Sequence, residues 1–335
     1  MNFTHRHHRL VAGLLIAAAF ALLVRCVSTP RRVDDHDNRP SPTRTPDSIV
    51  ASGAYFPIGT PVVLWQDPDG YDAYRREKFF TKEDVPDGKL RYAPLRGNLP
   101  DAIAANAAAY GELSLEELRQ VVHQFVIHFD VCCTSRQCFK ILQDKRCLSV
   151  HFMLDVDGTI YQTLDLREKA WHATIANDFS VGVEIAHPGA YPQPMNADMR
   201  RFYEKDEFGY KAKFPAWLEY GVRTPNFVAR PDRPDIIDGE IQGKRYYQLD
   251  FTPQQYEALA HLCAGLNRVF PRIRLDAPRD PDGEVRTAAL PEEELRAFDG
   301  IVGHFHVQTN KNDPGPAFQW ERVLRQARAL RAQPE

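Results

Sequence analysis

Three side chains in this sequence have the chemical types that bind a zinc ion. His128 and His304 each follow a short apolar run, and Asp313 lies in the proline- and glycine-rich segment 310–316. Two imidazoles and one carboxylate suit Zn²⁺ and leave a fourth position for water, which is the arrangement of a hydrolytic zinc site. The residue types alone leave a structural role for each histidine open, because the chain contains 12 histidines.

His306 competes with His304 for the same role. Residues i and i+2 of a strand share one face, so both imidazoles of a strand over 300–307 would point the same way. The glycine at position 303 favours His304 as the ligand.

The elements that would position these residues alternate between strands and helices. Apolar and β-branched runs predict three strands, at 121–129, 180–186 and 300–307. Asp155–Gly158 has the composition of a hairpin turn, a helical apolar period begins after Thr252, and 318–330 has the pattern of a terminal amphipathic helix. This alternation predicts an α/β fold with a central mixed β-sheet flanked by helices.

The N-terminus has the organisation of an export signal. Basic residues precede an apolar run from Val11 to Val24, which is shorter than the roughly 20 residues that cross a bilayer. Cys26 follows in a context that resembles a bacterial lipobox, although Arg25 stands where that motif has a small residue. Lipid attachment at Cys26, an uncleaved membrane anchor and plain secretion therefore remain open, and each places the protein in the periplasm or cell envelope.

Composition and sequence complexity divide the chain into parts. We expect a signal or anchor at 1–26, a proline-rich linker at 27–50, an N-terminal extension of unknown role at 51–120, and a main domain at 121–330 with an insertion at about 188–250. With 43% hydrophobic residues, the chain is a folded protein rather than a disordered one. A formal charge of −3 and no basic tract exclude an obvious nucleic-acid partner.

Several motifs occur in order along the main domain. They are Val126-Ile127-His128, His151-Phe152-Met153-Leu154, Trp171-His172-Ala173, Val181-Gly182-Val183-Glu184, and Lys311-Asn312-Asp313-Pro314-Gly315-Pro316. This series resembles the zinc-dependent N-acetylmuramoyl-L-alanine amidases of the amidase-2 family, relatives of the peptidoglycan recognition proteins. The resemblance implies the fold of that family and a peptidoglycan or muropeptide substrate, cleaved between N-acetylmuramic acid and L-alanine.

The resemblance also assigns roles to single residues. It makes His128, His304 and Asp313 the ligands of Zn²⁺, Glu184 the acid that handles the attacking water, and Lys311 the cation near the scissile carbonyl. These roles agree with the chemistry, because zinc activates water and polarises an amide. A partly desolvated carboxylate such as Glu184 suits proton transfer, and a lysine suits a developing oxyanion.

Some alternatives remain open within this resemblance. His172 either lines the cleft near the substrate or has a structural role. The loop that precedes Lys311 is one residue shorter than in similar bacterial proteins, which affects the reach of that side chain. A non-catalytic muropeptide-binding protein of the same fold is the rival function, and the loss of a ligand would indicate it. We expect a monomer.

Four cysteines follow His128 closely, at positions 132, 133, 138 and 147. They lack the paired C-x-x-C spacing of a structural zinc site. Export favours disulfides, and the recognition-protein relatives have a short bridge in this place. The resemblance therefore favours a Cys132–Cys138 disulfide, although four cysteines allow three connectivities.

Overall fold

The computed structural model describes residues 43–81 and 89–332. The apolar run 11–24 and Cys26 lie outside these ranges, so the signal peptide and the membrane tether stay predictions. Within the described ranges, no helix has the length and apolar character needed to cross a membrane.

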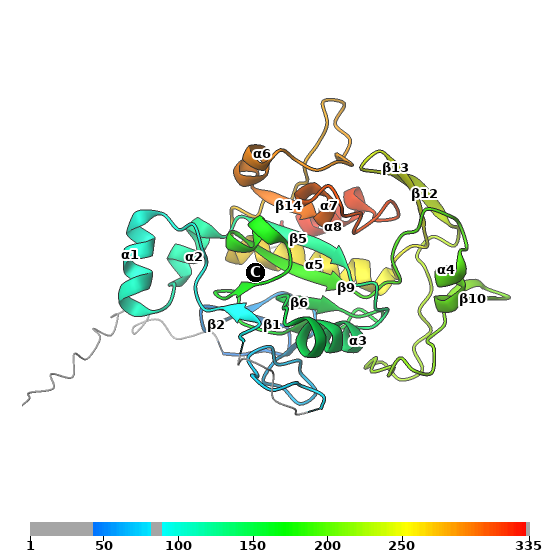
Figure 1. Ribbon diagram of the computed structural model, residues 1–335, viewed down its shortest axis with the longest axis horizontal. Coiled ribbons are helices and arrows are strands. Elements are labelled where there is room, and N and C mark those ends of the chain that lie inside the picture. Colours follow the sequence, from blue (N-terminus) through cyan, green and yellow to red (C-terminus); the bar gives the residue numbers. More distant parts are fainter. Residues whose placement is uncertain (1–42, 82–88, 333–335) are drawn as a thin grey trace, which may run out of the picture.

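A six-stranded sheet forms the centre of the molecule (Figure 1). Its strand order is β14 (Gly300–Gly303), β5 (Gln124–Phe129), β9 (Ser180–Ile185), β6 (Phe152–Leu154), β7 (Ile160–Gln162) and β3 (Val62–Leu64). All neighbours pair in parallel except β6 and β7, which form an antiparallel hairpin. The predicted α/β fold with a central mixed sheet is confirmed.

Helices cover both faces of this sheet. Along β6, Phe152 and Leu154 pack into the main core with helix α5 (Pro253–Val269), whereas Met153 between them packs with Phe139 of α3 (Ser135–Lys140). This alternation is expected because successive side chains of a strand point to opposite faces. α8 (Trp320–Arg331) packs against α5 from outside, and a π-helical turn (Ile141–Arg146) continues α3.

The start of α5 follows directly from its sequence. Thr252 accepts a hydrogen bond from the Gln255 N–H, and the Gln255 side chain accepts one from the Thr252 N–H. This capping box satisfies two of the amide groups that a helix start leaves free.

Residues ahead of the main domain take part in the fold. Ser48–Ala51 lies at the end of the predicted linker 27–50 but forms the buried strand β1, paired with β2 (Ala54–Pro57). The predicted extension 51–120 supplies the edge strand β3 of the central sheet. It also contains β4 (Tyr92–Ala93), α1 (Asp101–Tyr110) and α2 (Leu115–Val121).

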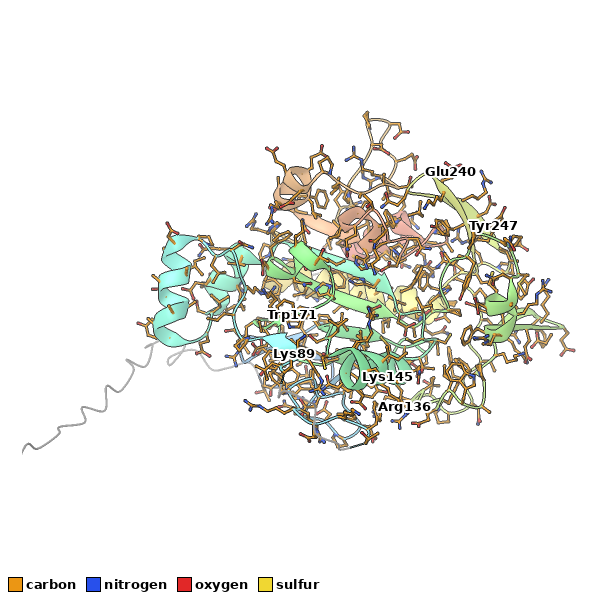
Figure 2. All side chains as sticks on the ribbon, in the orientation of Figure 1. Lys89, Arg136, Lys145, Trp171, Glu240 and Tyr247 are labelled. Atoms are coloured by element: carbon orange, nitrogen blue, oxygen red, sulfur yellow. The ribbon has the colours of Figure 1, made fainter. Side chains whose placement is uncertain are left out.

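The predicted insertion 188–250 forms a layer beside the sheet rather than part of it. Its elements are α4 (Ala197–Phe202), β10 (Tyr203–Asp206), β11 (Gly209–Ala212), β12 (Ile237–Ile241) and β13 (Lys244–Gln248). The strands form two antiparallel hairpins outside the central sheet, and Glu240 and Tyr247 lie on the β12–β13 hairpin (Figure 2). Arg136 on α3 connects α3 to this layer through an ion pair of 2.5 Å with Glu219.

Shorter elements complete the chain. They are β8 (Lys169–Ala170), a 3-10 turn (Thr174–Asp178), α6 (Glu292–Ala297) and α7 (His304–Val307).

The prediction of a strand over 300–307 is wrong beyond Gly303. The backbone leaves the sheet there, and His304–Val307 forms one helical turn, α7. Two interactions hold this turn: the Gly303 N–H donates to His306 Nδ1 at 2.9 Å, and the Phe305 N–H donates to the Asp313 carbonyl at 3.1 Å.

Candidate active site

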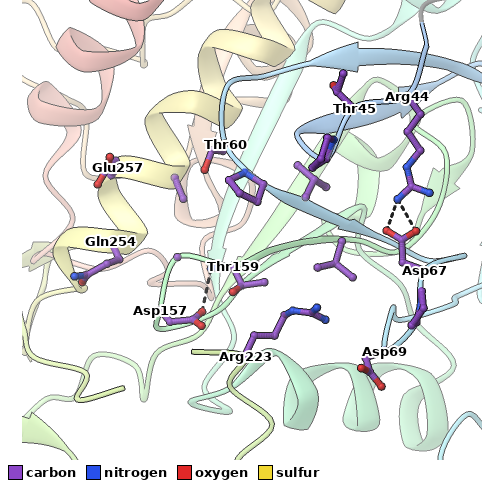
Figure 3. Close-up of a pocket in the computed structure, with 17 residues that line it drawn as sticks. Arg44, Thr45, Thr60, Asp67, Asp69, Asp157, Thr159, Arg223, Gln254 and Glu257 are labelled. Carbon is purple, nitrogen blue, oxygen red and sulfur yellow. Dashed lines mark hydrogen bonds and ion pairs between the residues drawn. The ribbon is translucent and has the colours of Figure 1, made fainter. Parts of the chain in front are cut away.

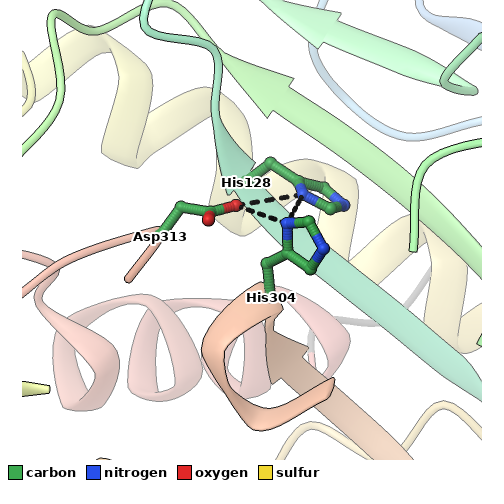
Figure 4. A group of neighbouring side chains, drawn as sticks. All are labelled: His128, His304 and Asp313. Carbon is green, nitrogen blue, oxygen red and sulfur yellow. Dashed lines mark hydrogen bonds and ion pairs between the residues drawn. The ribbon is translucent and has the colours of Figure 1, made fainter. Parts of the chain in front are cut away.

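The three predicted metal ligands converge on one point (Figure 4). His128 Nδ1 lies 2.9 Å from His304 Nδ1 and 3.0 Å from Asp313 Oδ2, and the last two atoms are 2.9 Å apart. His128 comes from the end of β5, His304 begins α7, and Asp313 lies in the loop between α7 and α8. All three residues are buried, with at most 6% of their surface exposed.

The chemistry of this donor set fits a zinc ion. Ligand atoms at 2.0–2.2 Å from a tetrahedral Zn²⁺ lie about 3.3 Å from one another, close to the observed spacing. Burial, together with the neighbouring His304, lowers the pKa of His128 to about 4, so its ring is neutral and able to coordinate at physiological pH. Burial alone would raise the pKa of Asp313, but the two imidazoles outweigh it and lower that pKa.

His306 does not face this point. Its Nδ1 accepts the Gly303 N–H, and its Nε2 donates to the Arg286 carbonyl at 2.6 Å. Both ring nitrogens therefore have backbone partners. In a helical turn, positions i and i+2 point in different directions, so the competition expected for a strand does not arise.

Glu184 lies on the neighbouring strand at the same level as His128. The register of β5 and β9 pairs His128 with Glu184, and paired positions of parallel strands share one face. Glu184 is partly exposed, but its Oε2 is buried and has no hydrogen-bond partner among the described residues. Burial raises the pKa of Glu184 well above its usual range, and the Asp313 carboxylate raises it further. A carboxyl group with a raised pKa and a free oxygen can both accept and release a proton.

Lys311 provides a cation close to this group. Its positive charge acts to lower the pKa of both Glu184 and His128, which places the side chain in their neighbourhood. A hydrogen bond of 3.2 Å from its N–H to the Gln308 carbonyl fixes the backbone of the short loop. The side chain is partly exposed and, within the described chain, makes no hydrogen bond, so it is available to a ligand.

Comparison with known proteins agrees with this geometry. Residues 118–211 match the family model Amidase_2, N-acetylmuramoyl-L-alanine amidase. Residues 118–211 are therefore similar to the amidase-2 family. No curated protein matches the chain.

Solved structures of amidases resemble the chain at low identity. A Se-Met AmpD derivative is 17% identical over 63% of this chain and 86% of that chain, with a TM-score of 0.30. The amidase AmiD from E.coli, in complex with a muropeptide substrate, is 18% identical over 61% of this chain and 57% of that chain, with a TM-score of 0.34. LysC from Clostridium intestinale URNW is 15% identical over 62% of this chain and 85% of that chain, with a TM-score of 0.31.

His172, which lies within the matched residues 118–211, contacts the proposed zinc ligand His128 directly. His172 Nδ1 lies 3.0 Å from His128 Nε2, the ring nitrogen that faces away from the metal point. Its own Nε2 lies 3.4 Å from the Ser180 hydroxyl. The prediction left open whether His172 contacts substrate or supports the structure, and this geometry gives it a positioning role toward His128.

Sequence reasoning missed the contribution of Gly182. A Cβ atom there would lie 2.5 Å from two atoms of the His172 ring, so the ring fits only above a glycine. A glycine in the middle of a buried strand often indicates such a close approach, and that signal was present in the sequence.

The predicted Cys132–Cys138 disulfide is not formed in the structure. All five cysteines of the described chain are free thiols. The Cys132 and Cys138 sulfurs lie within 4.8 Å of each other and of an Asp130 carboxylate oxygen. The two thiols are therefore neighbours without a covalent bridge.

Proposed function

We propose that the protein is a zinc-dependent N-acetylmuramoyl-L-alanine amidase that hydrolyses the amide between N-acetylmuramic acid and L-alanine in peptidoglycan or muropeptides. The observation that supports this most strongly is the convergence of His128, His304 and Asp313 beside Glu184. A hydrolytic zinc site needs three protein ligands, an open position and a nearby general base.

The mechanism assigns one task to each group. A zinc ion held by His128, His304 and Asp313 would polarise the amide carbonyl and increase the acidity of the attacking water. Glu184 accepts the proton of that water through its unpartnered Oε2. Burial raises the pKa of Glu184, which makes its carboxylate a stronger base toward the water, and the protonated group then passes this proton to the more basic leaving amine of L-alanine.

Lys311 stabilises the charge that develops on the carbonyl oxygen. Its ammonium group has no fixed partner in the described chain and lies near Glu184 and His128. A cation beside a developing oxyanion lowers the barrier more in a site that excludes water than it would in water.

The rival function is a non-catalytic peptidoglycan-binding protein of the same fold. A binding protein needs neither a complete ligand set nor a base, and both are complete in this chain.

We also propose that the protein acts in the periplasm or cell envelope, tethered through Cys26 or secreted, because its N-terminus resembles an export signal. We propose that it acts there as a monomer.

The test is product analysis. Zinc-loaded protein is incubated with purified sacculi and with a monomeric muropeptide, and the products are identified by mass spectrometry. The proposal requires release of intact peptides that begin with L-alanine, abolished by a chelator. Binding to sacculi without release of any peptide would favour the rival function.

A further inference from the structure

A long groove lies beside the edge strand β3, apart from the proposed active site. It consists of two cavities of about 810 and 740 Å³ that share Asp67, Asp69 and Arg223 in their walls, and Figure 3 shows the first of them. Within the described residues, neither cavity is lined by His128 or Glu184.

Arg223 is the free cation of this groove. The other three arginines that line it have acidic partners: Arg44 pairs with Asp67, Arg75 with Asp72, and Arg136 with Glu219. In the described chain the Arg223 guanidinium has neither a hydrogen bond nor an ion pair, and it points into the cavity (Figure 3).

Free carboxylates lie in the same groove. Asp69 and Glu257 line it and make no hydrogen bond or ion pair with the described residues. Asp157 accepts only backbone N–H groups. A groove with one free cation and several free anions is complementary to a ligand that has both a carboxylate and an ammonium group.

The insertion holds Arg223 in place. The neighbouring Thr224 N–H donates to Asp157 Oδ2 at 2.9 Å, which ties this segment to the turn between β6 and β7. The Tyr220 hydroxyl donates to the Phe227 carbonyl at 2.9 Å and closes the loop. Arg223 is thus presented from a fixed backbone, which reduces the entropy cost of binding.

One wall of the groove lies at the same end of the sheet strands as the active site. Strand β6 runs parallel to β5 and β9, so the turn 155–159 that lines the groove lies at the edge where His128 and Glu184 are found. β5 and β3 are four strand spacings apart, a separation of about 19 Å. A peptide of four residues spans at most about 14 Å, which is less than this separation, so the stem peptide at the scissile bond does not reach the part of the groove beside β3.

We propose that this groove binds a second stem peptide of the same peptidoglycan polymer, through the carboxylate and ammonium groups of that peptide. The inference rests on the proposed function. Arg223 binds the carboxylate, and Asp69 and Glu257 bind the ammonium group. Two linked binding events raise the apparent affinity for a polymer without changing the affinity for a monomer.

The experiment compares Arg223→Met with Arg245→Met, which removes an exposed arginine of the insertion outside both cavities. Both changes are made in a Glu184→Gln background, and binding to purified sacculi is measured by co-sedimentation. We expect Arg223→Met to weaken binding at least tenfold, and Arg245→Met to leave it unchanged. Equal binding by the two variants overturns the proposal.

Two further measurements define the ligand. Acetylating the free amines of the sacculi should weaken binding of the Arg245→Met protein and have no effect on a variant that combines Arg223→Met, Asp69→Asn and Glu257→Gln. Unchanged binding after acetylation would refute the ammonium part of the proposal. With Glu184 restored, the KM for a monomeric muropeptide should be the same in both arginine variants, and a raised KM in Arg223→Met would show that the groove belongs to the catalytic site.

These outcomes are separate from the proposed function. Co-sedimentation needs no hydrolysis. A protein that binds sacculi through Arg223 but releases no peptide would therefore refute the amidase function and support the proposal that the groove binds a stem peptide. A protein that releases peptides but binds sacculi equally well without Arg223 would support the amidase function and refute the proposed binding of a stem peptide in the groove.

Discussion

Replacing His172 with phenylalanine should weaken zinc binding while the protein remains folded. His128 Nε2 and His172 Nδ1 lie 3.0 Å apart, and when a metal occupies Nδ1 of His128, its Nε2–H donates to His172 and this hydrogen bond holds the tautomer. Partners of this kind typically contribute 10- to 100-fold to metal affinity. The change corresponds to a loss of about 1.4–2.8 kcal/mol of binding free energy.

The structure explains why the loss falls on the metal-bound form. In the metal-free protein, His128 can hold its proton on Nδ1 and donate it to Asp313 Oδ2 at 3.0 Å. With zinc bound, the proton must be on Nε2, and phenylalanine at 172 leaves that buried N–H without an acceptor. An unsatisfied buried donor costs about 1–3 kcal/mol, which agrees with the magnitude above.

The assay is competition for zinc with a chromophoric chelator, using protein whose fold is checked by circular dichroism. His172→Gln retains an acceptor and should recover part of the affinity. His261→Phe is the control, because His261 bonds the Ile58 carbonyl away from the site. An unchanged zinc Kd in His172→Phe would refute the positioning role. A normal Kd with a raised KM would instead identify His172 as a substrate contact.

Four more outcomes are expected. Glu184→Gln should keep zinc and fold but lose turnover by about 10²- to 10⁴-fold, measured on a muropeptide, and near-native turnover would refute its role as base. Lys311→Met should bind zinc normally and lower kcat by about tenfold or more, and an unchanged kcat would show that the lysine does not reach the oxyanion. Metal analysis should find no stoichiometric zinc in His304→Ala but one zinc in His306→Ala, and the reverse would exchange the two assignments. Burial lowers the pKa of His187 to about 4 in the folded protein, so the unfolded chain binds more protons between about pH 6.5 and 4. The free energy of unfolding should therefore fall as the pH drops through this range. Thermal melts should show a smaller fall in His187→Asn than in the unchanged protein.

Local interactions made much of the fold predictable from the sequence. The capping box of Thr252 and Gln255, the hairpin turn at Asp155–Gly158 and the buried run of β5 all depend on residues close in the chain. Patterns of this kind indicate elements, and alternating elements indicate an α/β sheet. The candidate metal ligands could also be proposed from the sequence, because the ability of histidine and aspartate to bind zinc is a property of the side chains themselves.

Contacts between distant segments decided the rest. The strand after Gly300 ends at Gly303 because the 303–305 backbone meets the loop around Asp313, which no local pattern shows. Strand β3 joins the sheet by pairing Val62–Leu64 with Ile160–Gln162, far along the chain.

Contacts between distant segments also decide the proposed roles of His172 and Arg223. The sequence shows His172 only as a histidine in a short motif. The fold places its ring over Gly182 and against His128. The sequence shows Arg223 only as one arginine of a long insertion. In the fold, the turn at Asp157 holds its segment beside β3. The sequence determined which chemical groups are present, and tertiary structure alone decided which of them meet, because those meetings depend on packing between segments that are remote in the chain.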